Sequence, residues 1–146
     1  MLTYSDGKHV FSVDLMFLWI KKYNPKVHIF EISQLDPEKI KFQSANVKFG
    51  IKKLIEHPDL DRDHYSRLRK ADLAYPIIVW RKSSGNLSIV DGVHRIGKSW
   101  FKKLTTIKTY IFDDAAMKKF IVGSGINPIK AEANVYRELF EYRFSN

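Results

Sequence analysis

The sequence predicts a single α+β domain in which a small mixed sheet is flanked by helices. Its 146 residues suit one domain with one hydrophobic core. Short β-branched runs of strand length alternate with segments whose apolar residues recur every three or four positions, and this order indicates both helices and strands. With 45% apolar and 28% charged residues and no low-complexity stretch, the composition is that of a globular protein.

The N-terminal part predicts a helix and then a strand. Ser12 or Asp14 can cap a helix through Tyr23, because the apolar residues between them form a wide stripe and a proline follows soon after. Residues 27–33 are short and rich in β-branched side chains, which favours a strand. Residues 40–60 mix both periodicities and predict no single element.

The centre of the chain predicts a helix, a hairpin, a helix and a strand. Residues 61–73 are typical of a charged helix. Two apolar runs, 77–80 and 87–90, are joined by a turn of serine, glycine and asparagine, so a hairpin is expected. Apolar residues at helical spacing then continue to Leu104, and residues 106–112 return to a strand.

The C-terminal part predicts two helices separated by a loop. Asp113 and Asp114 can cap a helix over 115–122. A glycine-containing loop over 123–128 precedes a final helix that ends near Phe144.

The charge balance favours anionic partners. Lysine and arginine exceed aspartate and glutamate by 25 to 16, so the formal net charge is +9. Such a charge attracts nucleotides, nucleic acid or a membrane surface, and it does not choose among them. The excess is spread along the chain in short clusters, so no basic tail identifies the partner.

Cysteine content and hydropathy limit the remaining classes. The chain has no cysteine, which excludes disulfides, a thiolate metal site and a cysteine nucleophile and makes an intracellular location the expectation. The uncharged run 15–20 is far too short to span a bilayer, and no small-residue cleavage site follows it. We therefore expect a soluble protein without a membrane partner.

Residues 87–95 predict a buried strand that enters an anion-binding turn. The stretch from Gly92 to Ser99 also matches the P-loop pattern GxxxxGK[ST], in which Lys98 would reach phosphates and Ser99 would bind Mg²⁺. Bulky residues stand where a phosphate-wrapping loop needs glycine, and too few residues follow Ser99 for the further βα units. The P-loop match is therefore interpreted as accidental.

The alternative places the turn at Asp91-Gly92. The next three residues then form the amino end of a helix, whose free N–H groups and dipole attract an anion. His94 and Arg95 supply donors to phosphate oxygens, and Lys98, one turn further on, can point back toward the same anion. The structural alternatives are that Asp91 is only a cap and Lys98 only part of a solvated basic helix face.

These residues resemble a known family. The pattern Pro76-Ile-Ile-Val79, a turn, Leu87-Ser-Ile-Val90, Asp91-Gly92-Val93-His94-Arg95, a helix and a strand is similar to the ParB/sulfiredoxin superfamily. The resemblance covers residues 27–114 in organisation, with helical extensions at both ends. Its G-x-H-R turn implies a site that holds nucleotide phosphates.

Members of this superfamily differ in activity. Sulfiredoxins carry a catalytic cysteine where this chain has Val93, so sulfinic-acid reduction is excluded. The CTP-binding partition proteins match at Arg95 but have arginine in place of His94, and often glutamine in place of Tyr75. The turn is most similar to that of the archaeal free serine kinases.

That last similarity implies ATP or ADP, Mg²⁺, and a phosphotransferase or NTPase activity. The implied phosphate-binding positions lie in the turn and the next helical turn: Gly92, Val93, His94, Arg95, Lys98 and Ser99. Asp91 and His94 are the implied catalytic positions, and Asp91 is also the implied Mg²⁺ ligand. The resemblance names neither a general base nor a phosphoryl acceptor.

Charged residues outside the turn supply further candidates. A charged group before the core strand can line the same cleft, although its i, i+4 charge pair is more typical of a helix surface: Asp63, His64, Arg67, Arg69 and Asp72. Asp72 is the best placed carboxylate in that group. Glu31 interrupts an apolar strand, which makes it a candidate base or metal ligand.

Two other functions stay open. The basic surface can bind nucleic acid directly, although too few C-terminal residues remain for a helix-turn-helix domain. A catalytically silent interaction module with the same fold is the third alternative. The sequence does not indicate an oligomeric state.

Overall fold

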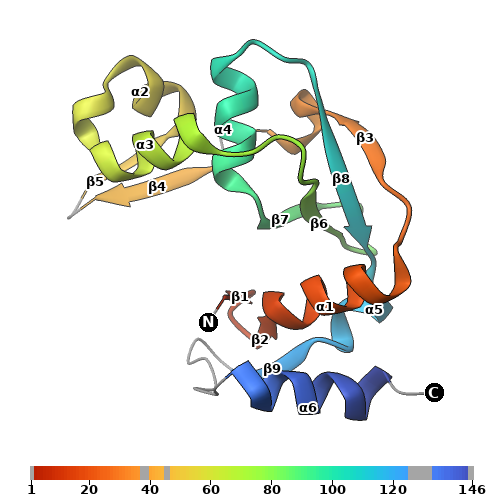
Figure 1. Cartoon of the computed structure of the whole chain (residues 1–146). Helices are drawn as coiled ribbons and strands as arrows, with labels where there is room; N and C mark the ends of the chain where they lie inside the picture. The colour runs from red at the N-terminus through yellow and green to blue at the C-terminus, as the bar shows by residue number, and fades with distance from the viewer. Residues whose placement is uncertain (1, 37–39, 45–46, 125–132, 145–146) are drawn as a thin grey trace. The chain divides into compact units, whose positions relative to one another are not determined.

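The computed structural model describes residues 2–36, 40–44, 47–124 and 133–144, and it confirms the α+β class (Figure 1). The chain forms two compact units. Unit 1 consists of residues 1–26, 80–86 and 112–146, and unit 2 of residues 27–79 and 87–111.

Unit 1 is built on a small antiparallel sheet in the order β1-β2-β9. The strands are β1 (Thr3–Ser5), β2 (His9–Ser12) and β9 (Ile121–Ser124). Its helices are α1 (Val13–Tyr23), α5 (Asp114–Lys118) and α6 (Ala133–Phe144).

The bounds of α1 follow from its local sequence. The Ser12 side chain accepts a hydrogen bond from the Leu15 N–H, and Asn24 ends the helix in the left-handed conformation with its own N–H on the Ile20 carbonyl. Buried residues of α1, among them Leu15 and Met16, belong to the apolar core of unit 1. Both predicted ends of this helix are confirmed.

Unit 2 contains most of a four-stranded sheet in the order β3-β8-β6-β7. Its strands are β3 (His28–Glu31), β6 (Ile77–Arg81), β7 (Leu87–Asp91) and β8 (Thr106–Phe112), of which β6 and β8 end in residues of unit 1. A separate hairpin is formed by β4 (Lys41–Ser44) and β5 (Val47–Gly50). The helical elements are η1 (Ile32–Leu35), α2 (Ile51–Glu56), η3 (Pro58–Leu60), α3 (Arg62–Lys70) and α4 (Val93–Phe101).

Several sequence predictions need correction or completion. The strand expected over 27–33 ends at Glu31, because Ile32–Leu35 form η1. The helix expected to continue to Leu104 ends at Phe101, and Lys103 has positive φ. The helix expected over 115–122 ends at Lys118, because the β-branched pair Ile121-Val122 belongs to β9, which pairs with β2. The ambiguous stretch 40–60 contains a hairpin followed by a short helix, which explains why both periodicities occur in it. No helix in the described part of the chain has the length and apolar character needed to cross a membrane.

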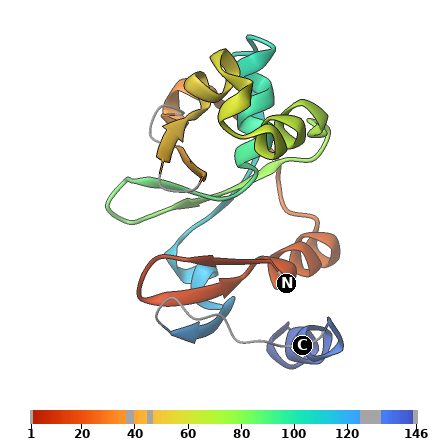
Figure 2. The ribbon, with the colours of Figure 1, turned by 90° about the vertical axis from the view of Figure 1, so that its left-hand side faces the viewer.

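The core of unit 2 joins its sheet to its helices. Leu68 of α3, Ile77 of β6 and Ile96 of α4 are fully buried in one apolar cluster that also includes Ile51 and Leu54 of α2. Figure 2 shows the three helices gathered together. Burial of such side chains contributes about 1.5–3 kcal/mol each, so this cluster fixes how the helices pack.

Gly97 allows α3 and α4 to approach closely. A Cβ atom at this position would lie 2.9 Å from Leu68 Cγ, closer than real Cβ contacts occur. The second glycine of the P-loop pattern, Gly97, therefore lies inside α4 and allows close helix packing.

We expect Gly97→Ala to destabilise the fold by roughly 1–3 kcal/mol, because overpacking against Leu68 outweighs the better helix propensity of alanine. Urea denaturation measures the change. In the double variant Gly97→Ala/Leu68→Ala the total loss should be smaller than the sum of the two single losses. Strict additivity would contradict the contact.

Candidate functional site

The strand-to-helix turn predicted from the sequence is present in unit 2. Strand β7 ends at Asp91, Gly92 has φ +115°, and α4 begins at Val93. A Cβ at Gly92 would lie 2.8 Å from Ile77 Cβ and 3.3 Å from its Cα, so the turn lies directly against β6. Only glycine satisfies both the left-handed conformation and this close approach.

We expect Gly92→Ala to lower the free energy of unfolding by roughly 2–4 kcal/mol, through backbone strain plus overlap with Ile77. Gly85→Ala is the matched control. Gly85 also has positive φ, but a methyl group at this position would meet nothing within 4 Å, so strain alone should cost about 1–2 kcal/mol. Equal losses in urea denaturation would show that the contact with Ile77 does not matter.

The start of α4 offers backbone donors. Helices α1, α3 and α5 begin with side-chain caps from Ser12, Asp61 and Asp113, whereas Gly92 has no side chain to cap α4. The first hydrogen bond of the α4 backbone joins the Ile96 N–H to the Gly92 carbonyl. The preceding N–H groups therefore point out of the helix start, where an anion can accept from them.

Two histidines meet beside this helix start. His64 Nδ1 of α3 and His94 Nε2 of α4 lie 3.0 Å apart, which is hydrogen-bond distance. The ring planes are within 19° of parallel and the centroids 5.2 Å apart, so the rings lie end to end. The Phe42 ring borders both, with centroids 4.8 Å from His64 and 5.7 Å from His94.

Asp61 completes a short polar chain. Its Oδ1 caps α3 by accepting from the backbone N–H of His64 at 3.0 Å, and its Oδ2 lies 4.0 Å from Nε2 of the His64 ring. The order Asp61, His64, His94 thus leads from the start of α3 to the start of α4.

Burial keeps His94 uncharged at neutral pH. Burial and, after it, the positive charges of Arg67 and His64 together lower the pKa of His94 to about 4, and Asp63 partly opposes them. An anion at the α4 start would favour the protonated ring and raise this pKa. His94 can therefore take up a proton when an anion binds.

The low pKa of His94 makes stability depend on pH. His94 has a pKa of about 4 when folded and 6.5 ordinarily, so between these values the unfolded chain binds more protons. Wild type should therefore lose stability relative to His94→Gln as the pH falls from about 6.5 toward 4.

Urea denaturation of both proteins at neutral pH and near the lower end of that window measures this difference. His57→Gln controls for the removal of an exposed histidine. A stability difference between wild type and His94→Gln that is the same at both pH values would contradict the burial of His94.

Arg95 is held at the edge of the turn. Its Nη1 donates to the Pro76 carbonyl at 3.1 Å and to Asp91 Oδ2 at 3.4 Å. Asp91 is therefore partly neutralised by its neighbour, which weakens it as a cation ligand. The guanidinium has further N–H donors for a phosphate.

Lys98 and Ser99 point elsewhere. Lys98 Nζ donates to the Ala71 carbonyl at 2.7 Å and so stabilises the end of α3. The Ser99 hydroxyl is buried, and it has no hydrogen-bond partner among the described residues. Val93 packs against the unit 2 core. Of the six predicted phosphate-binding residues, only Gly92, His94 and Arg95 are therefore left as candidates at the turn.

The two outlying carboxylates serve local structure. Asp72 is exposed, and its Oδ1 accepts from the Ala74 N–H at 2.9 Å in a turn after α3. Glu31 is exposed at the end of β3, and its N–H donates to the Gln34 side chain. Strands β8 and β6 lie between β3 and β7, the strand that ends at Asp91.

The structure adds Asp61 and Phe42 to the site, and it brings His64 and Arg67 to it from a larger group of charged candidates. From the sequence, His64 and Arg67 are candidates to line the cleft but more typical of helix surface charge, and Asp61 and Phe42 are not among the predicted site residues. Asp61 and His64 have the spacing of a helix cap and its third residue, which was the available signal. No signal in the sequence marked Phe42, because the pairing of the β4–β5 hairpin brings its ring to the histidines.

Known proteins add no further assignment. Comparisons with models of protein families, with curated proteins and with solved structures find no match to this chain.

Proposed function

We propose that unit 2 binds a nucleotide through its phosphates at the start of α4. The observation that carries this proposal is the uncapped first turn of α4 beside the His64 and His94 pair. Helix N-termini bind phosphate through N–H groups and the helix dipole. The resemblance of the Asp91-to-Arg95 turn to the ParB/sulfiredoxin superfamily supports the same ligand class and the same fold family.

The side chains divide the work of binding. The first-turn N–H groups and Arg95 meet phosphate oxygens, while the positive charge of Arg67, which already acts on His94, adds to the attraction. His94 accepts a proton from solvent as the anion arrives, and its hydrogen bond with His64 holds the ring in place. Phe42 shields the histidine pair from water on one side.

Mg²⁺ fits this site only together with the nucleotide. The described residues contain no group of three or more histidine or acidic side chains arranged to hold a metal, and Asp91 is occupied by Arg95. Mg²⁺ is commonly bound by one or two carboxylates plus substrate phosphates, a role that leaves Asp91 as the ligand on this chain. It would supply charge neutralisation for a phosphotransferase or NTPase reaction.

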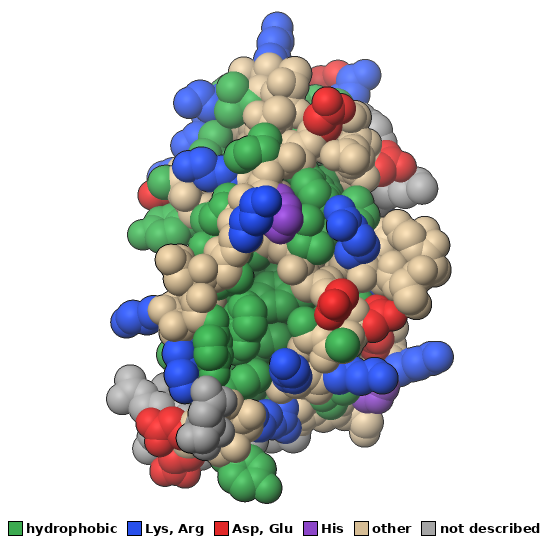
Figure 3. Space-filling model, turned by 90° about the vertical axis from the view of Figure 1, so that its right-hand side faces the viewer, with side chains coloured by type: hydrophobic (Ala, Val, Ile, Leu, Met, Phe, Trp, Pro, Cys, Tyr) green, Lys and Arg blue, Asp and Glu red, His purple; other side chains and the backbone are tan. Residues whose placement is uncertain are grey.

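A second candidate is nucleic-acid binding through the basic surface. Arg67 and Lys70 are exposed on α3, and the net charge of +9 favours polyanions. Lys and Arg side chains on the face drawn in Figure 3 do not merge into one continuous patch. On this face, the dispersed charges form no long electrostatic track.

The test is calorimetric titration of ATP, ADP and CTP with and without Mg²⁺. We expect binding in wild type and a loss of about tenfold or more in His94→Gln and Arg67→Gln, because each removes a donor or charge at the phosphates. Arg62→Gln is the matched control, since Arg62 is an exposed residue of the same helix that pairs with Asp59. Circular dichroism checks that each variant is folded.

Two outcomes decide against the proposal. If both variants bind nucleotide as tightly as wild type, the site is not at the α4 start. If ATP, ADP and CTP all fail to bind wild type, the proposed nucleotide-binding function is wrong. Parallel titration of single-stranded and duplex oligonucleotides over a salt series tests the second candidate. A steep fall in affinity with salt, together with no mononucleotide binding, would favour nucleic acid.

A further inference from the structure

Unit 1 contains a pocket that the proposed function does not use. Its volume is about 700 Å³, within the usual range for small-ligand sites. Three segments line it: the β1–β2 turn with part of β2, the end of β6 with the turn after it, and α5 with the start of β9. Every lining residue belongs to unit 1, so the pocket is complete within that unit.

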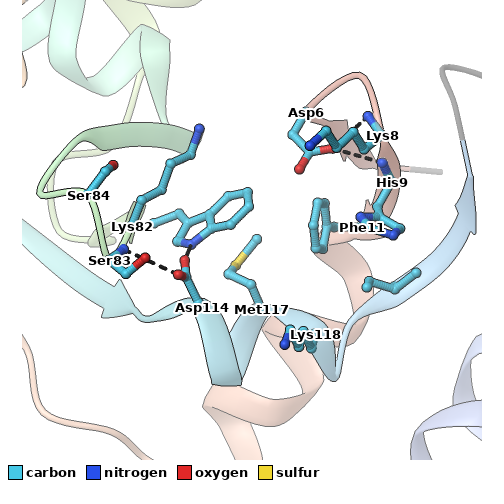
Figure 4. Close-up of a pocket in the computed structure, with 12 residues that line it drawn as sticks. Asp6, Lys8, His9, Phe11, Lys82, Ser83, Ser84, Asp114, Met117 and Lys118 are labelled. Atoms are coloured by element: carbon cyan, nitrogen blue, oxygen red, sulfur yellow. Dashed lines mark hydrogen bonds between the residues drawn. The ribbon is translucent and has the colours of Figure 1, made fainter.

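The apolar lining is fixed in place by its own contacts. The Trp80 indole N–H donates to Asp114 Oδ1 at 2.7 Å. The Phe11 ring meets the Trp80 ring edge to face, with centroids 5.3 Å apart. Met117 adds a polarisable side chain, and Figure 4 shows it between Asp114 and Phe11. Such a lining suits a flat apolar group.

The pocket's two carboxylates are already engaged. Asp6 Oδ1 accepts from the N–H groups of Lys8 and His9 at 2.9 and 2.8 Å. Asp114 accepts from Trp80 and, through Oδ2, from the Ser83 N–H at 3.2 Å. The hydrogen bonds from Trp80 and Ser83 hold the pKa of Asp114 below its ordinary value. Both acidic groups therefore serve the structure of the lining.

The pocket's lysines are available to a ligand. Lys8, Lys82 and Lys118 lie around it, and none of their ammonium groups forms an ion pair within the described part of the chain. Lys82 Nζ lies 4.9 Å from the Trp80 ring centroid. In Figure 4, Lys82 borders one side of the pocket and Lys8 the other, with Lys118 below. Positive charge thus surrounds an aromatic lining.

We propose that this pocket binds a small anionic molecule with a flat aromatic body. The aromatic body packs against Trp80 and Phe11, and the positive charge of the three lysines attracts the anionic group. The aromatic lining and the lysine charges together select for aromatic anions. A neutral ring lacks the charge contacts, and an anion without a ring lacks the apolar contacts. A free mononucleotide and an aromatic acid both present this chemistry.

The indole N–H of Trp80 provides a local readout. The chain has three tryptophans, Trp19, Trp80 and Trp100, so a ¹⁵N-labelled sample gives three indole signals, and Trp80→Phe assigns the one in the pocket. The probes are AMP and 2-naphthalenesulfonate as aromatic anions, with adenosine and inorganic phosphate as the two halves of AMP. We expect both aromatic anions to displace the Trp80 signal saturably, and each half to bind at least about fivefold more weakly.

Lys118→Gln tests the charge contribution. It should weaken binding of both aromatic anions about fivefold. Lys119→Gln is the matched control, because Lys119 is the adjacent exposed lysine and does not line the pocket. No displacement by either aromatic anion, equal binding of adenosine and AMP, or equal effects of the two lysine variants would overturn the proposal.

A further experiment distinguishes binding in this pocket from binding at the α4 site. In the double variant His94→Gln/Arg67→Gln the Trp80 displacement by AMP should persist unchanged. Loss of the Trp80 displacement in this double variant would show that the signal reports binding at α4, and it would overturn the pocket proposal. Persistence of the Trp80 response when no nucleotide binds at α4 would support the pocket and count against the proposed function alone.

Discussion

The contact between α3 and α4 at Leu68 and Gly97 is the constraint on which the candidate site depends. His64 lies one helical turn before Leu68, and His94 lies nearly one turn before Gly97, so each pair shares a helix face. With the helices in contact at Leu68 and Gly97, the two histidines lie within hydrogen-bond distance of each other. Lys98, the residue after Gly97, reaches the Ala71 carbonyl at the end of α3. A bulkier residue at position 97 would separate all three contacts.

Local features of this site were predictable because they depend on neighbours in sequence. The turn at Gly92 follows from a strand that runs straight into a helix, and the structure shows that Ile77 also excludes any side chain there. The hairpin of β6 and β7 and the helix α1 were likewise predictable from turn composition and capping residues. These elements account for two of the four strands of that sheet and for the position of the turn.

The rest depends on tertiary packing that one sequence does not display. His64 was indistinguishable from surface charge until α3 packed on α4, and Phe42 lay in a stretch where two periodicities overlapped. The sequence predicted that Lys98 can point back to the turn, but its ammonium group donates to the carbonyl of Ala71, the residue that ends α3. Glu31 looked unusual inside an apolar run, and its place at a strand end explains its exposure. The single-domain organisation and the bound nucleotide stay predictions.

The hydrogen bond between His64 and His94 couples the tautomers of the two rings. One nitrogen must carry the hydrogen and the other must not, so the arrangement of one imidazole dictates that of its partner. A ligand that requires a particular tautomer of His94 therefore also sets the tautomer of His64, and with it the group that faces Asp61. The starts of two helices are in this way linked by the position of a single hydrogen atom.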